Sequence, residues 1–224
     1  FYDLFQTGNQ QLGIIIADVC DKGVCAALFV GIFRSLIHAY LEGAHPWNRV
    51  AENPQNYPDD STDVSGKTIG ALSFLNHYIQ RHHGNEGIFA TLFLGILNTP
   101  DGHLEYINAG HEPLMIIGRD GIVRELSPTG PAIGISSEAR FELQSARLDH
   151  GETLIGFTDG VTDACRNGGN RFCRTGVRDA VKCADESDEN FMQCILDHVF
   201  DHLGGYDLTD DIAMISISRL QETS

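Results

Sequence analysis

Aspartate residues stand at three places where an apolar, strand-like run begins or ends. The three places are Asp18 after Ile14–Ala17, Asp159 after Leu154–Thr158, and Asp210-Asp211 before Ile212–Ile217. If these strand ends converge, several carboxylates lie together, and such like charges cannot all stay ionised without a compensating cation. With oxygen ligands alone, that cation would be a hard metal ion such as Mg²⁺ or Mn²⁺. The alternative for each aspartate taken singly is a helix or turn cap.

Hydrophobic periodicity predicts the elements that must position these residues. The predicted strands are Leu12–Ala17, Phe89–Leu97, Leu104–Asn108, Leu114–Ile117, Phe141–Leu148, Thr153–Thr158 and Ala213–Ser218. The predicted helices are Val24–Leu41, mostly buried with one narrow polar stripe, then 67–83 and 188–203. Helices grouped between strands, without regular alternation, favour an α/β protein of the α+β type with antiparallel sheets.

Residues 43–66 follow neither period and contain Pro46, Pro54 and Pro58, so we expect a long loop. It is either a solvated connector or a flap that contacts a partner, since long structureless loops within compact domains are often functional. Trp47, the only tryptophan, could anchor it.

Composition excludes several classes of protein. Fifteen Lys and Arg against 31 Asp and Glu give a net charge of −16, which disfavours nucleic-acid binding. The apolar runs are shorter than the roughly 20 residues of a membrane span. Six cysteines without a C-x-x-C pair indicate free thiols, so we expect a cytoplasmic protein and no membrane contact in this segment.

Five motifs together resemble a known family. They are Asp18–Leu28, Phe89–Gly95, Tyr106–Pro113, Thr158–Ala164 and Thr209–Ile212. In this order they resemble the SpoIIE/RsbU-like branch of the PPM-type metal-dependent serine/threonine protein phosphatases, over almost the whole chain.

The resemblance implies a central β-sandwich of two mostly antiparallel sheets flanked by helix pairs, with two Mn²⁺ or Mg²⁺ ions at one edge. By position, Asp18 would bridge the ions and the carbonyl of Val19 would add a ligand. Asp159 and Asp210 would complete the core, with Asp211 as a neighbour. In the family a metal-activated water attacks the phosphorus of phosphoserine or phosphothreonine, so Asp18, Asp159 and Asp210 are the predicted catalytic residues.

The sequence departs from the family pattern in three places. A Gly-Gly-Asp, whose Asp binds metal, normally precedes Phe1-Tyr2-Asp3, so that ligand would lie upstream of this chain. Cys20-Asp21 replaces the usual Ser-Gly, and Asp21 either adds charge near the metals or caps the following helix. Cys173 stands where the family commonly has Gly.

Three further residues are candidates for substrate or supporting contacts. Lys22 either contacts phosphate or faces solvent paired with Asp21. His111 is either a turn histidine or an acid-base group. Asp163 either positions metal-bound water or lies on the first turn of a new helix.

We therefore expect residues 1–224 to form a single phosphatase domain, cut from a longer regulatory protein with an upstream sensory or receiver domain. The resemblance implies a phosphorylated protein substrate, such as a STAS-domain anti-sigma-factor antagonist, and a homodimer is also compatible with it. The alternative is a docking module of the same fold with a degraded metal site, which binds a partner protein.

Overall fold

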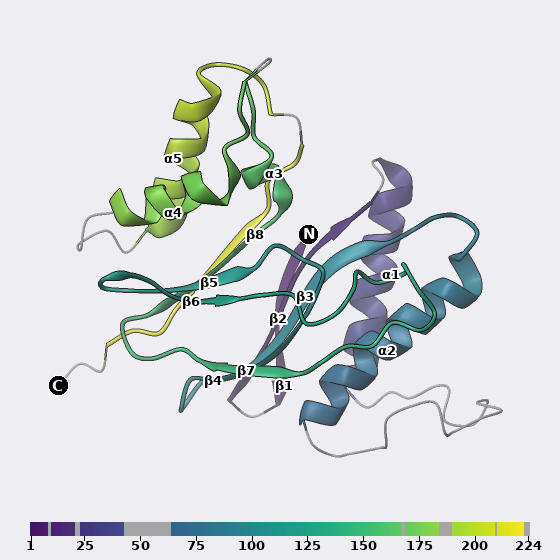
Figure 1. Cartoon of the computed structure of the whole chain (residues 1–224). Helices are drawn as coiled ribbons and strands as arrows, with labels where there is room; N and C mark the ends of the chain where they lie inside the picture. The colour runs from purple at the N-terminus through teal and green to yellow at the C-terminus, as the bar shows by residue number, and fades with distance from the viewer. Residues whose placement is uncertain are drawn as a thin grey trace. The chain divides into compact units, whose positions relative to one another are not determined.

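The computed structural model describes residues 1–8, 10–20, 23–42, 64–166, 169–183, 190–208 and 210–221. They form two compact units (Figure 1). Unit 1 contains Phe1, Asp3–His111 and Pro128–Arg147, and unit 2 contains Tyr2, Glu112–Ser127 and Leu148–Ser224. Each unit has one sheet and its own helices, so the predicted pair of sheets with helices in groups is confirmed.

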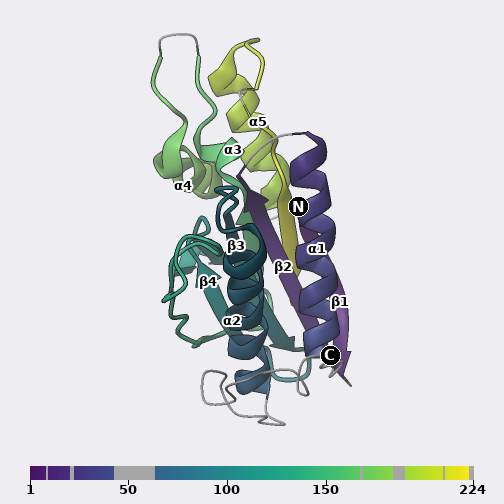
Figure 2. The same cartoon turned by 90° about the vertical axis from the view of Figure 1, so that its right-hand side faces the viewer.

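Unit 1 is built on a five-stranded sheet in the order β1-β2-β3-β4-β7. Its strands are β1 (Tyr2–Gly8), β2 (Gln11–Val19), β3 (Ala90–Asn98), β4 (His103–Ala109) and β7 (Gln144–Arg147). The pairings from β2 through β7 are antiparallel. Helices α1 (Val24–Leu41) and α2 (Val64–His83) run side by side over this sheet (Figure 2) and bury a shared apolar core with it.

Helix α1 has the predicted ends, but its predicted burial is wrong. Only Phe29, Phe33, Ile37 and Leu41 are buried within unit 1, while Val24 and Leu28 are 79% and 63% exposed. A helix that lies on one sheet beside one other helix can cover only part of its circumference, which is why an almost wholly apolar helix shows so much apolar surface. With a mean hydropathy of 1.8 over 18 residues, α1 also meets the length and composition criterion for a membrane span, one that core helices of globular proteins meet as well.

Helix α2 corrects the predicted start of the second helix. It begins at Val64 instead of 67, so the last three residues of the predicted loop 43–66 are helical. Residues 43–63, with Trp47, lie outside the described residues, as do Asp21 and Lys22.

Unit 2 contains a four-stranded antiparallel sheet in the order β6-β5-β8-β9. Its strands are β5 (Leu114–Gly118), β6 (Gly121–Leu126), β8 (Thr153–Phe157) and β9 (Met214–Ser218). Its helices are α3 (Asp159–Thr162), α4 (Cys173–Cys183) and α5 (Phe191–Leu203). Helices α4 and α5 contact each other and bury their apolar faces in the core of this unit.

The less apolar elements were not predicted from the sequence, or were predicted with different bounds. Strands β1 and β6 and helix α4 were not predicted, and the strand predicted at Phe141–Leu148 is only β7. Strands β1 and β6 lie at sheet edges, where polar residues are tolerated on the exposed side. Helix α4 is rich in charge and buries only a narrow stripe of three residues, which gives a weak apolar signal.

Candidate functional site

Asp18 stands one residue before the end of β2, as its position after an apolar run predicts. It is half-buried, and its register partner on β3 is Thr91. Val19 is buried and pairs with Ala90. The next residue, Cys20, continues the pairing through its N–H, which donates to the carbonyl of Phe89 at 2.9 Å. Asp18 and Val19 are therefore held by strand pairing on a rigid part of unit 1.

The turn after β4 brings His111 to the same strand pair. Its Nδ1 lies 2.9 Å from Oγ1 of Thr91, the residue paired with Asp18. Its main-chain N–H donates to Oδ1 of Asn108 at 2.8 Å, so the side chain of Asn108 helps to hold this turn. His111 is buried, and these contacts fit the turn-histidine alternative.

Gly110 in this turn is a position where only glycine fits. It has a φ of +71°, in the left-handed region, and a Cβ there would lie 2.9 Å from the main-chain nitrogen of Ala132. The backbone of this turn therefore approaches the following segment too closely for any side chain.

In unit 2, Asp159 begins the one-turn helix α3 directly after β8. The preceding residue, Thr158, is buried and joins this junction to the segment before β9. Its Oγ1 donates to the carbonyl of Asp211 at 3.2 Å and accepts from the N–H of Ala213 at 3.0 Å. Its main-chain N–H donates to the carbonyl of Ala213 at 3.0 Å. Thr158 thus fixes the main chain of Asp159 beside that of Asp211.

Gly160 allows the two segments to come this close. A Cβ at Gly160 would lie 2.3 Å from the carbonyl oxygen of Asp211, well inside the distance of closest approach. In the Asp210-Asp211 segment, Oδ1 of Asp210 accepts from the N–H of Asp211 at 2.9 Å, and Asp211 is exposed.

The electrostatics of unit 2 identify Asp159 as the centre of an acidic group. Burial raises the pKa of its carboxyl, and the negative charges of Asp163 and Asp210 raise it further, against the effect of the N–H of Gly160. Like charges that raise one another's proton affinity are also well disposed to accept a cation. The structure therefore places Asp163 and Asp210 within electrostatic reach of Asp159.

Asp163 is the C-cap residue that closes the single turn of the new helix α3. It follows the last residue of α3 and donates its N–H to the carbonyl of Asp159 at 2.7 Å. Its Oδ1 accepts from Nη1 of Arg171 at 2.9 Å. The carboxylate thus already has a cationic neighbour.

Glu112 is a fourth acidic residue near this group, and the sequence reading missed it. It is half-buried, and burial raises the pKa of its carboxyl, against the opposing charge of Arg174 and with a smaller contribution from Asp159. Glu112 was visible as the residue after His111 in the Tyr106–Pro113 motif, but nothing in its spacing indicated a contact with α3. Thr158 and Arg174 were missed for the same reason.

The donor chemistry of these residues fits a hard divalent cation. Asp159, Asp163 and Asp210 offer only carboxylate oxygens, the ligands that Mg²⁺ and Mn²⁺ prefer. Within the described ranges, no three His, Cys, Asp or Glu side chains meet at metal-binding spacing. Asp18, Val19 and His111 belong to unit 1, and the aspartates Asp159, Asp163, Asp210 and Asp211 belong to unit 2.

Comparison with known proteins decides the family. The SpoIIE family model, described as Stage II sporulation protein E, matches residues 8–220. The chain belongs to the SpoIIE family. It lies in the SpoIIE/RsbU-like branch of the PPM-type phosphatases, as the five motifs predict.

Two curated SpoIIE relatives match nearly the whole chain. Protein IcfG of Synechocystis sp. (strain ATCC 27184 / PCC 6803 / Kazusa) is 38% identical over 225 residues, covering 98% of this chain and 35% of its own length. Phosphoserine phosphatase RsbU of Bacillus subtilis (strain 168) is 26% identical over 223 residues, covering 97% of this chain and 58% of its own length. The chain therefore spans about a third to somewhat over half of these relatives.

Solved structures confirm the PPM fold of this SpoIIE-family chain. The PP2C phosphatase domain of SpoIIE from Bacillus subtilis, solved with a fragment of its regulatory domain, superimposes with a TM-score of 0.73 at 18% identity. The match covers 100% of this chain and 59% of that one. A structure of RsbX in complex with magnesium gives a TM-score of 0.59 at 15% identity, covering 96% and 84%.

Proposed function

We propose that this chain is a metal-dependent protein serine/threonine phosphatase. The observation that carries the proposal is the position of Asp159 beside the main chain of Asp211, where burial raises the pKa of its carboxyl and the charges of Asp163 and Asp210 raise it further, which favours a cation there. The PPM fold and the similarity to a protein named phosphoserine phosphatase support the same class of reaction.

The proposed metal ligands are aspartates and one main-chain carbonyl. Asp159 and Asp210, with Asp211 as a neighbour, would be ligands of Mn²⁺ or Mg²⁺, as would Asp18 and the carbonyl of Val19. When bound, two such ions supply a nucleophile from water at neutral pH and neutralise phosphate oxygens. This positive charge would let a chain with a net charge of −16 bind a phosphate group.

The surrounding residues have separate tasks in this proposal. Asp163, kept in place by Arg171, would orient a water molecule toward the phosphorus. Lys22 would contact a phosphate oxygen. His111 would keep the β3 side of the site in place through Thr91, the residue paired with Asp18.

The substrate that we propose is a phosphoserine or phosphothreonine on a small regulatory protein of the STAS type, met in the cytoplasm. Support for the phosphoserine class comes from the relative named for it. An upstream sensory or receiver domain and a homodimer belong to the same proposal.

The test is hydrolysis of p-nitrophenyl phosphate and of a phosphoserine peptide by the protein with its natural upstream residues. The assay is run with Mn²⁺, with Mg²⁺ and with EDTA, for the wild type and for Asp159→Asn. We expect turnover that requires metal and falls by about two orders of magnitude in the variant. A folded wild type that hydrolyses neither substrate with either metal would overturn the proposal in favour of a docking module.

A further inference from the structure

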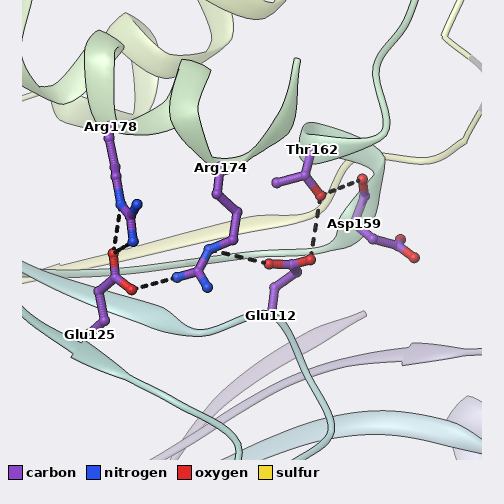
Figure 3. Close-up of polar contacts among 6 residues, drawn as sticks. All are labelled: Glu112, Glu125, Asp159, Thr162, Arg174 and Arg178. Atoms are coloured by element: carbon purple, nitrogen blue, oxygen red, sulfur yellow. Dashed lines mark hydrogen bonds and ion pairs between the residues drawn. The ribbon is translucent and has the colours of Figure 1, made fainter. Parts of the chain in front are cut away.

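Charged side chains in unit 2 form a continuous row from α4 to α3 (Figure 3). Arg178 donates from Nη2 to Oε1 of Glu125 at 2.8 Å, and Arg174 donates from Nη2 to Oε2 of the same residue at 2.7 Å. Nε of Arg174 lies 3.9 Å from Oε2 of Glu112. The other oxygen of Glu112 is 3.5 Å from Oγ1 of Thr162, the last residue of α3.

Thr162 connects this row of side chains to Asp159. Its hydroxyl is buried and also lies 3.2 Å from the carbonyl oxygen of Asp159, so this one donor lies within reach of both Asp159 and Glu112. Glu112 therefore contacts the main-chain turn that directs the Asp159 side chain, while that side chain points away from Glu112 (Figure 3).

Helix α3 needs such outside contacts. It is four residues long, far below the roughly 12 residues at which an isolated helix becomes even marginally stable in water. Thr158 fixes its beginning through Asp211 and Ala213. Glu112 is the side chain that contacts its end through Thr162.

The pairing of Glu112 with Arg174 explains how a fourth carboxylate is tolerated beside Asp159 and Asp163. Oε2 of Glu112 and Nε of Arg174 are both buried, and neither atom has a hydrogen-bond partner among the described residues. These two atoms thus face each other away from water, so the loss of Arg174 leaves this oxygen of Glu112 without a counter-charge, whereas Arg174 keeps its contact with Glu125 if Glu112 is lost. Glu125 accepts from Arg174 on one carboxylate oxygen and from Arg178 on the other, so Arg174 has its contact with Glu125 independently of Arg178.

We infer that Glu112 is a positioning residue of the proposed phosphatase site, with Arg174 as its counter-ion: together they hold the α3 turn that directs the carboxylate of Asp159, a proposed metal ligand. This inference rests on the proposed function. Partners that orient a ligand from behind typically change metal affinity or activity by about 10- to 100-fold.

The experiment measures two quantities in the protein with its natural upstream residues. One is the Mn²⁺ concentration for half-maximal hydrolysis of p-nitrophenyl phosphate, with kcat and KM determined separately. The other is the shift of the thermal midpoint caused by Mn²⁺, which reports metal binding without turnover. The variants are Glu112→Leu, Glu112→Gln, Arg174→Met and, as the matched control, Arg178→Met.

Glu112→Leu should raise the half-saturating Mn²⁺ concentration about tenfold, lower kcat and leave KM for the phosphate ester within about twofold. Glu112→Gln, which keeps an oxygen for Thr162, should recover a large part of this loss. Arg174→Met should resemble Glu112→Leu, and Arg178→Met should resemble the wild type.

Two results would overturn the inference. One is wild-type Mn²⁺ dependence in Glu112→Leu by both measures, and the other is an equal loss in Arg178→Met, which would indicate a purely structural role. If the wild type shows no turnover, the proposed function fails, and the Mn²⁺-induced thermal shift then decides the inference by itself.

Discussion

The hydroxyl of Thr158 donates to the carbonyl of Asp211 at 3.2 Å and so ties together two segments that lie 53 positions apart in the sequence. Because this hydroxyl is used between strands, it does not cap α3, although Thr158 occupies the N-cap position. Thr158 therefore does not stabilise the end of the helix as a cap. It holds the segment that contains Asp210 beside Asp159.

Replacing Thr158 by valine tests this arrangement. Valine keeps the shape but leaves the N–H of Ala213 and the carbonyl of Asp211 without their partner, at a cost of about 1–3 kcal/mol in the free energy of unfolding. We expect phosphatase activity to fall about tenfold as well, because Asp210 is no longer held beside Asp159.

Thr153→Val on the same strand is the control. Its hydroxyl pairs with Oγ of Ser218 at 2.9 Å at the other end of β8. Urea denaturation and phosphatase assays should show lower stability with unchanged kcat in the control. Equal loss of activity in both variants would argue against a local role for Thr158.

Removing the Asp159 charge should separate repulsion from metal binding. In the absence of metal, Asp159→Asn relieves the repulsion from Asp163 and Asp210, so we expect a higher thermal midpoint than in the wild type. Added Mn²⁺ should stabilise the wild type and leave the variant almost unchanged.

Differential scanning calorimetry with and without Mn²⁺ checks this second prediction. Asp120→Asn, at an exposed position between β5 and β6, is a charge-matched control that should keep the full Mn²⁺ effect. A lower metal-free midpoint in Asp159→Asn would contradict the repulsion argument.

The carboxyl of Asp3 should make the free energy of unfolding depend on pH in the acidic range. Burial alone would raise the pKa of its carboxyl, but hydrogen bonds from Arg34 and His38, each 2.7 Å long, lower it below its ordinary value. A carboxyl with a lowered folded pKa stabilises the protein above its unfolded pKa of about 4, and this contribution is lost as the pH falls through the lowered folded value.

The comparison is between the wild type and Asp3→Asn, by urea denaturation from pH 7 to pH 2.5. The wild type should be the more stable protein at pH 7, and the difference should shrink as the pH falls below about 4. A difference that is constant over this range would show that the ion pairs with Arg34 and His38 contribute nothing.

Cys173 occupies a backbone conformation that suits glycine. Its φ is +58°, a left-handed value that costs a residue with a side chain about 1–2 kcal/mol. Cys173→Gly relieves this strain, which stabilises the folded protein. Glycine also has more conformational freedom in the unfolded chain, which offsets part of this effect, so we expect the free energy of unfolding to rise by about 0.5–1 kcal/mol. Cys173→Ala keeps the Cβ and therefore the strain, so its denaturant midpoint should equal that of the wild type. If Cys173→Ala were stabilised as much as Cys173→Gly, loss of the thiol and not relief of strain would be the cause.

The elements that sequence predicts best are those whose own residues decide their burial. Strands β2, β3 and β5 are nearly continuous apolar runs, and helix α1 has both of its predicted ends. By contrast, β6 exposes Arg124 and becomes a strand only through pairing with β5. A local hydrophobic pattern does not show which distant segment a strand will pair with.

The same distinction holds for the candidate site. Asp159 and Asp210 were predictable because each adjoins an apolar strand, and β8 and β9 prove to be neighbours. Glu112 and Arg174 were not, because their contact depends on how α4 packs on the β5–β6 pair. Asp163 was expected on the first turn of a new helix and closes that turn, but the end of the helix after four residues was not predictable, since so short a helix gives almost no sequence signal.

The interleaving of the two units restricts how this protein can be divided. The chain passes from one unit to the other at 111–112, at 127–128 and at 147–148. The β5–β6 hairpin, which includes Glu125, therefore lies in the sequence between two strands of the sheet in unit 1. No single cut yields two intact halves, so gene fusion or recombination can add whole domains at the ends but cannot exchange one sheet for that of a relative. The two sheets are thus inherited together.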